Sequence, residues 1–302
     1  MSRELSFKTA MVFAYGEPSP ISPGIVRVVA DNPSVLTFKG TNTYLVGMTA
    51  LAVIDPGPDD GAHRAAILKA AAARPITHIF ITHAHRDHVD GALPLKAATG
   101  AEIHGFGRVP GSGGTPALNP SGAEFIDYGF TPDVRLADGD LVEGKDWRLA
   151  AIHTPGHAPD HLCFALLGRA ILFSGDHVMA WNTTLVAPPE GSMADYTSSL
   201  QTLFGRHETL YLPGHGGRIE EPLRTVKAYL LHRRWREQSI LAAIKNGIRT
   251  IQTIVPVVYP AIDDRLSTAA ALSVLAHVEH LIQRGLVTCD GSPIWDRPLA
   301  PL

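Results

Sequence analysis

The sequence of 302 residues contains only two cysteines, Cys163 and Cys289, and their separation matches no metal or redox motif. Their scarcity excludes a disulfide framework and is typical of a reducing compartment. No apolar run reaches the roughly 18–20 residues that a membrane span requires. The start, "MSRELSFKTAMVFAYG", has an early Glu4 and no small-residue cleavage site, so it does not resemble a secretory signal. We therefore expect a cytoplasmic protein that does not enter a membrane.

Strong charge of either sign is also missing, since the formal net charge is only −3 and 18% of residues are charged. The first two-thirds of the chain are acidic and the remainder is basic. This offset hints at two domains and at an anionic partner for the second, although ordinary solvated faces often show as much. The hydrophobic content of 45% and the chain length allow one large domain with a buried core and a small second one.

Short β-branched runs alternate with alanine-rich stretches through the first two-thirds of the chain, which predicts a layered α/β domain. The expected strands are "IVRVV", "TNTYLVG", "LAVID", "ITHIFI", "AEIHG", "WRLAAIH", "LCFALL" and "AILFSGD". A helix is expected over residues 59–74, with Asp59 or Asp60 near its start, and "DYTSSLQTLFG" should form another that Gly205 ends. The Gly- and Pro-rich residues 105–132 form either a substrate-covering lid or a disordered loop.

The pattern becomes mainly helical after residue 221. Apolar side chains at helical spacing predict three helices, over residues 223–244, shortly after Thr250, and over residues 267–284. Two short runs around Asp290 and Gly291 indicate a β-hairpin. Three helices and a hairpin in about 80 residues predict a small winged-helix-like domain. We expect a catalytic domain at residues 1–221 and the winged-helix-like domain at 222–302.

Side chains that bind metals gather where predicted strands end. The motif "THAHRDH", residues 82–88, places three histidines and an aspartate directly after the strand "ITHIFI". Further along, "TPGH" ends in His157, "SGD" ends in Asp176 and "LPGH" ends in His215. Because ligand sites in layered α/β folds form where strand ends meet, we expect these side chains to converge.

In this order, "THAHRDH", "TPGH", "SGD" and "PGHG" resemble the metallo-β-lactamase superfamily of dinuclear metal hydrolases. The stretches "FKGTNTYLVG" and "HRRWRE" extend the likeness to the lactamase-β-like endoribonucleases, which carry a winged-helix domain after the catalytic one. The resemblance implies a metallo-β-lactamase αββα sandwich followed by a small winged-helix-like α+β domain.

The resemblance also implies the metal ligands. One metal takes His83, His85 and His157, the second takes Asp87, His88 and His215, and Asp176 bridges both. The implied cofactor is a pair of zinc ions, with manganese as the alternative. A metal-bridging hydroxide would attack the substrate, and Asp87 or Asp176 would pass a proton to the leaving group.

Two departures from related families narrow the chemistry. Diiron members of the superfamily tend to have a glutamate where His85 stands, which disfavours redox iron. The common dizinc β-lactamases use a cysteine on the second metal and lack a bridging aspartate like Asp176. Antibiotic hydrolysis is therefore not the expected main activity.

Other polar residues near the ligands are candidates to orient them or to touch the substrate, namely His153, His161 and His177. Asp55, in "VIDPG", is a candidate to hydrogen-bond a ligand imidazole, and the alternative for it is a turn-forming aspartate. The remaining histidines that we considered are expected at the surface or in packing, namely His63, His104, His207 and His277.

The substrate must be inferred from the surroundings of the site, because such centres hydrolyse several substrate classes. The resemblance favours a phosphodiesterase that acts on single-stranded RNA. Residues 218–249 hold eight Lys and Arg against three acids, and the candidate phosphate contacts there are Arg233, Arg234 and Arg236. A solvated helix face is the alternative explanation of this basic run.

The alternative function is a glyoxalase-like thioesterase or lactone hydrolase that acts on a small metabolite. A nucleic-acid binder with a relict metal site ranks last, because all seven ligand positions are kept. The third predicted helix of the C-terminal region carries Arg284 as its only basic residue besides histidines, so sequence-specific DNA binding is not expected. Winged helices also pack within a chain or dimerise, and a homodimer is therefore a further candidate.

Overall fold

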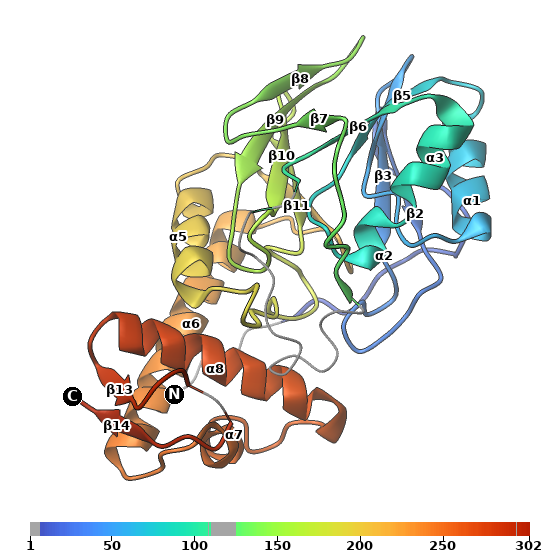
Figure 1. Ribbon diagram of the computed structural model, residues 1–302. Coiled ribbons are helices and arrows are strands. Elements are labelled where there is room, and N and C mark those ends of the chain that lie inside the picture. Colours follow the sequence, from blue (N-terminus) through green and yellow to red (C-terminus); the bar gives the residue numbers. More distant parts are fainter. Residues whose placement is uncertain (1–6, 108, 110–124, 294) are drawn as a thin grey trace.

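Two β-sheets pack face to face, helices cover their outer faces, and a smaller helical unit follows (Figure 1). This arrangement comes from a computed structural model that describes residues 7–107, 109, 125–293 and 295–302. Most of the segment 105–132, for which a lid or a disordered loop was expected, lies outside the described residues.

The first sheet has the strand order β1-β2-β3-β4-β5-β6-β7. Its strands are Ser19–Ser22 (β1), Ile25–Val29 (β2), Asn42–Val46 (β3), Leu51–Ile54 (β4), Ile76–Phe80 (β5), Glu102–Gly105 (β6) and Val134–Arg135 (β7). The strands β4 to β7 run parallel. Helix Gly61–Ala71 (α1) connects β4 to β5, and helices Arg86–Val89 (α2) and Ala92–Thr99 (α3) connect β5 to β6. As expected, Asp60 caps α1, its side chain accepting a hydrogen bond from the backbone N–H of Ala62 at 2.8 Å.

The second sheet has the order β12-β11-β10-β9-β8. Its strands are Leu141–Glu143 (β8), Arg148–His153 (β9), Leu162–Leu166 (β10), Ile171–Gly175 (β11) and Leu210–Pro213 (β12). The parallel pair β11 and β12 is joined through helix Met193–Phe204 (α5), which Gly205 ends as predicted. Every strand predicted from the sequence in this domain is present, because each combines β-branched or aromatic residues with flanking turn residues.

Three apolar layers produce the αββα order. Apolar side chains of α1 and α3, such as Ile67 and Leu95, pack on the outer face of the first sheet. Tyr44 and Phe80 of the first sheet meet Phe164 and other large side chains of the second sheet between the two. The outer face of the second sheet packs against α5 and the next helix, α6. The fold class that the sequence predicted is therefore confirmed.

The C-terminal unit consists of Pro222–Lys245 (α6), Ile251–Val258 (α7), a short 3₁₀ turn at Asp264–Leu266 (η1), Ser267–Gln283 (α8), Val287–Cys289 (β13) and Leu299–Pro301 (β14). Helix α6 belongs to both units. Val226 and Tyr229 pack against the second sheet, whereas Ile240 and Ile244 lie in the core of the C-terminal unit. The domain boundary between residues 221 and 222 stays a prediction.

The predicted hairpin around Asp290 and Gly291 is wrong in its pairing. Strand β13 pairs antiparallel with β14, in the register Val287 to Pro301, so the partner strand begins at Leu299 and not directly after Gly291. Of the second predicted run, Ile294 lies outside the described residues. The prediction used only the turn residues Asp290 and Gly291. The pairing depends instead on packing against the helices, because Leu299 of β14 is buried in the same core as Val287 of β13. No helix in the described part of the chain has the length and apolar character needed to cross a membrane.

Candidate metal centre

The motif "THAHRDH" lies at the carboxyl end of β5, where the strand passes into α2. His83 and His85 occupy the connecting loop, and His85 stands at the N-cap position of α2. Asp87 lies in the first turn of α2, where the partial positive charge of the helix N-terminus favours a carboxylate. The backbone N–H of Ala84 donates to Asp160 Oδ2 at 3.0 Å, which fixes the loop between the two histidines.

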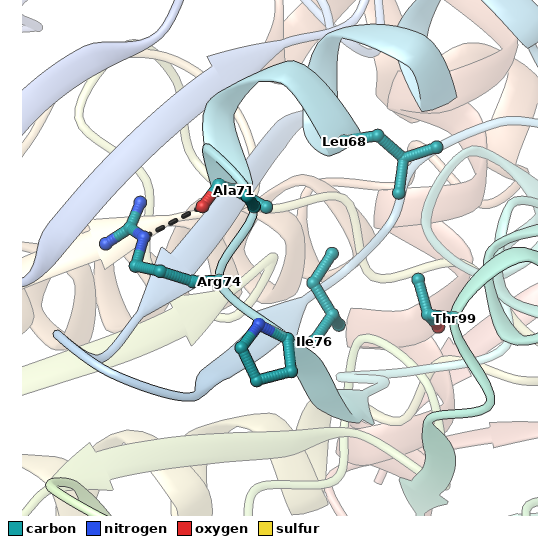
Figure 2. Close-up of a pocket in the computed structure, with 7 residues that line it drawn as sticks. Leu68, Ala71, Arg74, Ile76 and Thr99 are labelled. Atoms are coloured by element: carbon teal, nitrogen blue, oxygen red, sulfur yellow. Dashed lines mark hydrogen bonds between the residues drawn. The ribbon is translucent and has the colours of Figure 1, made fainter.

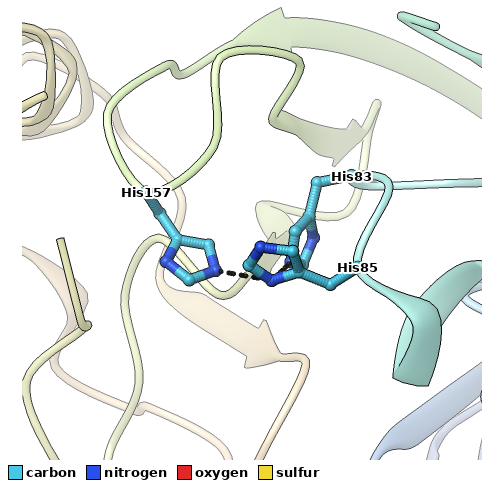
Figure 3. A group of neighbouring side chains, drawn as sticks. All are labelled: His83, His85 and His157. Carbon is cyan, nitrogen blue, oxygen red and sulfur yellow. Dashed lines mark hydrogen bonds between the residues drawn. The ribbon is translucent and has the colours of Figure 1, made fainter. Parts of the chain in front are cut away.

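The first three predicted ligands of one metal come together from two loops (Figure 3). His85 Nδ1 lies 2.9 Å from His83 Nε2 and 3.2 Å from His157 Nε2. The ligand atoms of all three lie within 4.8 Å of one another. Three imidazole nitrogens that converge on one point are a suitable donor set for a zinc-class ion.

The predicted ligands of the second metal form an adjacent group. His88 Nε2 lies 3.2 Å from His215 Nε2, and Asp87 Oδ2 lies 3.3 Å from the former and 3.2 Å from the latter. His88 and His215 are fully buried, whereas a quarter of the Asp87 side chain is exposed. This triad therefore has one face near solvent.

Asp176 lies between the two triads. Its Oδ2 is 3.3 Å from His215 Nε2 and 3.8 Å from His157 Nε2, so one carboxylate faces both groups. Glycine is required at position 175, directly before Asp176. Its φ is +47°, which side chains rarely allow, and an added Cβ would lie 2.5 Å from His161 Nε2. Within the described part of the chain, the Oδ1 atom of Asp176 is buried without a hydrogen-bond partner. A cation there would satisfy this oxygen, and the donor set therefore fits a pair of divalent metals.

The charges of the site also fit cations. Burial lowers the pKa of His83 well below its usual value and that of His85 to about 3, so both rings are neutral ligands. Burial alone would raise the pKa of Asp176, but His215 and His88 outweigh it and hold that pKa well below its usual value. In return, the carboxylates outweigh burial and raise the pKa of His215 to about 9. The carboxylates and these two histidines thus favour positive charge at this position.

Asp55 is the residue that orients the two histidines from β5 and α2. Its Oδ2 accepts from His88 Nδ1 at 2.9 Å and from Thr82 Oγ1 at 2.8 Å, and its Oδ1 accepts from Thr82 N at 2.8 Å. Because the Thr82 hydroxyl donates to Asp55, it accepts from His83 Nδ1 at 2.9 Å. Both histidines therefore keep an Nε2 lone pair for a metal. The sequence indicated Asp55 but not Thr82, although Thr82 opens the motif.

The other ligands are held largely by groups that the sequence cannot reveal. Backbone carbonyls of Leu185 and Gly40 accept from the Nδ1 atoms of His157 and His215, at 2.7 and 3.2 Å. Because a carbonyl belongs to every residue type, no motif marks these partners. Thr41 Oγ1 donates to Asp87 Oδ2 at 3.1 Å and was also missed.

The three neighbouring histidines have different positions. His161 Nε2 accepts from the backbone N–H of Asp176 at 3.1 Å, so this ring holds the predicted bridging residue in place. His177 is buried and packs on the ring of Tyr196, with a centroid separation of 4.6 Å. His153 stacks on Phe106, and its Nε2 donates to a backbone carbonyl, that of Pro159. Only His161 thus contacts a predicted ligand directly.

The arginines expected to contact phosphates are mostly engaged within the protein. Arg233 is only 4% exposed; it donates to the carbonyl of Thr184 and lies over the ring of Tyr196. Arg236 donates to the carbonyl of Val258 and stacks on aromatic rings. Arg234 is exposed. The expectation of a three-arginine phosphate surface is corrected, because helical periodicity turns Arg233 inward.

A hollow of about 200 Å³ elsewhere on the protein has no chemistry of this kind. It lies between α1, α3 and the start of β5, the opposite end of the strand from the histidine loop (Figure 2). Leu68, Ile76 and Thr99 line it, and the Arg74 side chain at its rim donates to the Ala71 carbonyl at 2.8 Å. The candidate active site is therefore the histidine and aspartate cluster.

Comparisons with known proteins agree with this geometry. Residues 36–215 match the metallo-beta-lactamase superfamily, and residues 250–295 match the beta-lactamase associated winged helix domain. A beta-lactamase-like protein 2 homolog of Drosophila melanogaster is 31% identical over 277 residues, which cover 88% of this chain and 90% of that protein. An atrochrysone carboxyl ACP thioesterase of Aspergillus fumigatus is 30% identical over 244 residues, covering 79% and 70%.

A solved structure shares the architecture of both units. The beta-lactamase domain protein of Burkholderia ambifaria superposes with a TM-score of 0.80 at 20% identity, over 97% of this chain and 95% of that one. At this identity the likeness concerns the fold alone. The matched ranges, the Drosophila relative and the converging ligand types together show that the chain belongs to the metallo-β-lactamase superfamily, as a metal-dependent hydrolase with a β-lactamase-associated winged helix domain.

Proposed function

We propose that this hydrolase cleaves thioesters of small acyl compounds, using two zinc-class ions held by the seven side chains predicted from the sequence. His83, His85 and His157 would hold one ion, Asp87, His88 and His215 the other, and Asp176 would contact both. The observation that carries the choice of thioesters is the fungal relative named as a thioesterase, whose similarity spans 79% of this chain. Manganese is the alternative metal.

The side chains divide the work of hydrolysis. When bound, divalent metals in such a site act as Lewis acids, polarising a carbonyl and lowering the pKa of water to about 7. Water adds to the acyl carbon, the carbon–sulfur bond breaks, and the proton from water ends on the thiolate. Asp87 is suited to carry that proton, because a quarter of its side chain reaches solvent, compared with 9% for Asp176.

An aromatic wall beside the second triad supports an apolar acyl group. The rings of Phe38 and Trp181 stack with centroids 4.8 Å apart. Trp181 packs so closely on Gly216 that an added Cβ would lie 2.6 Å from its ring, and Gly216 directly follows His215. Both rings are half-buried and so retain surface that a hydrocarbon chain can cover.

Single-stranded RNA is the second candidate substrate. Two features support RNA, namely the resemblance to lactamase-β-like endoribonucleases and the exposed Arg234 on α6. Arg233 no longer supports it, because this residue is buried, and Arg236 supports it less, because it donates to a backbone carbonyl. A phosphodiester would therefore meet less positive charge on this helix than the sequence suggested.

A side-by-side assay tests the proposal. Wild type, Asp176→Asn and Arg234→Ala are given a panel of acyl thioesters, with thiol release as the signal, and a single-stranded RNA oligomer. We expect thioester turnover in wild type and Arg234→Ala and its loss in Asp176→Asn, while circular dichroism shows a preserved fold. Intact thioesters together with cleaved RNA would reject the proposal and favour the phosphodiesterase.

A further inference from the structure

A second group of metal-binding side chains lies on the first sheet, away from the site described above. Strands β5 and β6 are neighbours in the first sheet (Figure 1). They run parallel, with His78 opposite Glu102 and Phe80 opposite His104. Because side chains alternate along a strand, these four point to the same face. The ligand atoms of His78, Glu102 and His104 lie within 4.8 Å of one another.

This group is distinct from the dinuclear centre. His78 lies within β5, whereas His83 follows the end of that strand, five residues later, which is at most about 16 Å of extended chain. Its face of the sheet is the inner one, where Phe80 and Trp147 pack between the two sheets. No functional role was predicted for His78 or Glu102 from the sequence, and His104 was expected to be a surface or packing residue.

His104 is the strongest indication of a missing partner. The residue is 4% exposed, and neither ring nitrogen has a hydrogen-bond partner among the residues that the structure describes. The ring stacks on Phe80 and lies beside His78, with centroids 5.1 Å apart in each case. Burial lowers the pKa of His104 to about 4, so the ring is neutral at pH 7 and its lone pair is available. A buried polar group of this kind is costly unless something binds it.

The tautomer of His78 is set so that its Nε2 is also free. Thr77 Oγ1 donates to the carbonyl of Leu51 at 3.3 Å, so this hydroxyl accepts from His78 Nδ1, which lies 2.8 Å away. The proton therefore stays on Nδ1 and the lone pair stays on Nε2. Metal-binding histidines are commonly held in this way by a partner on the other ring nitrogen.

Glu102 supplies negative charge at the open side of the group. Its side chain is 65% exposed, and Oε2 lies 3.9 Å from His104 Nε2. Two tetrahedral ligands with bonds near 2.1 Å are about 3.4 Å apart, so the exposed carboxylate needs to move only slightly. From this geometry we propose that His78, Glu102 and His104 form a third, mononuclear site for a transition-metal ion.

Two imidazoles and one carboxylate favour zinc, nickel or copper over calcium and magnesium, which prefer oxygen ligands. Water from the exposed side would complete the coordination. Such an ion would link β5 to β6 and stabilise the folded state by its binding free energy. The function is structural, because the site is closed on its inner face by Phe80 and Trp147.

The test measures metal binding in the whole chain with the dinuclear centre weakened. In an Asp176→Asn background, metal-free protein is titrated with Zn²⁺ and with Co²⁺, whose absorption reports coordination. Glu102→Gln and His104→Phe are compared with Glu143→Gln, an exposed glutamate on β8. We expect one metal-binding step whose affinity falls at least about tenfold in Glu102→Gln and in His104→Phe, which is typical when a metal site loses a supporting residue. The affinity of this step should not change in Glu143→Gln.

Elemental analysis of the protein without the Asp176 substitution provides a second readout. Three ions per chain are expected, falling to two in Glu102→Gln. If Glu102→Gln kept the wild-type affinity for this ion, or if the wild type bound only two ions, His78 and His104 would be a packing cluster only. Should His104→Phe fail to fold, Glu102→Gln decides alone, because its side chain is largely exposed.

Discussion

Replacing Asp55 by asparagine should weaken metal binding at the second triad without changing the size of the side chain. In the wild type, Oδ2 accepts hydrogen bonds from His88 Nδ1 and from Thr82 Oγ1. An amide NH₂ group at that position would face two donors. His88 relieves the conflict by moving its proton to Nε2 and accepting at Nδ1. Nε2, the atom that faces Asp87 and His215, then has no lone pair for a metal.

The expected loss of metal affinity follows from how directly Asp55 contacts the ligands of each ion. Loss of such a partner typically costs about 10–100-fold in metal affinity, or about 1.4–2.7 kcal/mol. The upper part of this range is expected for the second ion, because His88 depends on Asp55 directly. The lower part is expected for the first ion, since His83 is reached only through Thr82 Oγ1 at 2.9 Å.

A competition titration with a chromophoric zinc chelator measures both steps on metal-free protein. The matched control is Asp59→Asn, an exposed aspartate four residues away that pairs with Arg64. Circular dichroism should show the same fold in all three proteins. If Asp55→Asn bound both ions with wild-type affinity, the argument from the histidine tautomer would be refuted.

Two further predictions concern stability. Arg233→Ala should lower the free energy of unfolding by about 2–3 kcal/mol, because it removes a charged hydrogen bond to the Thr184 carbonyl and a contact with Tyr196. Arg234→Ala should change it by less than about 0.5 kcal/mol in the same urea titration; equal effects would contradict the inward position of Arg233. Burial raises the pKa of Glu279 from 4.5 to about 7, so the folded state loses stability as pH rises between these values. Glu279→Gln should therefore raise stability by about 1–2 kcal/mol at pH 8, after allowance for partial exposure, and by little at pH 4; thermal unfolding at both pH values measures this, and a gain confined to pH 4 would contradict it.

Local patterns predicted much of the fold because their causes are local. Strands such as Ile76–Phe80 and Leu162–Leu166 combine apolar residues with turn residues at both ends. Helix α1 begins after Asp60 because a side-chain cap needs only its immediate neighbours. The pairing of β13 was mispredicted, because the choice of β14 depends on a core that Leu299 and Val287 share with three helices.

The sequence by itself determined which residues could bind metal and that they follow strand ends. The tertiary structure alone decided how they meet: His88 and His215 are 127 residues apart in the chain, and their nitrogens lie 3.2 Å apart. It also decided that Arg233 is buried and that His104, among the described residues, has no hydrogen-bond partner. The physical reason is that ligand type is a property of one side chain. Distance and burial depend on how two sheets pack, which short motifs do not encode.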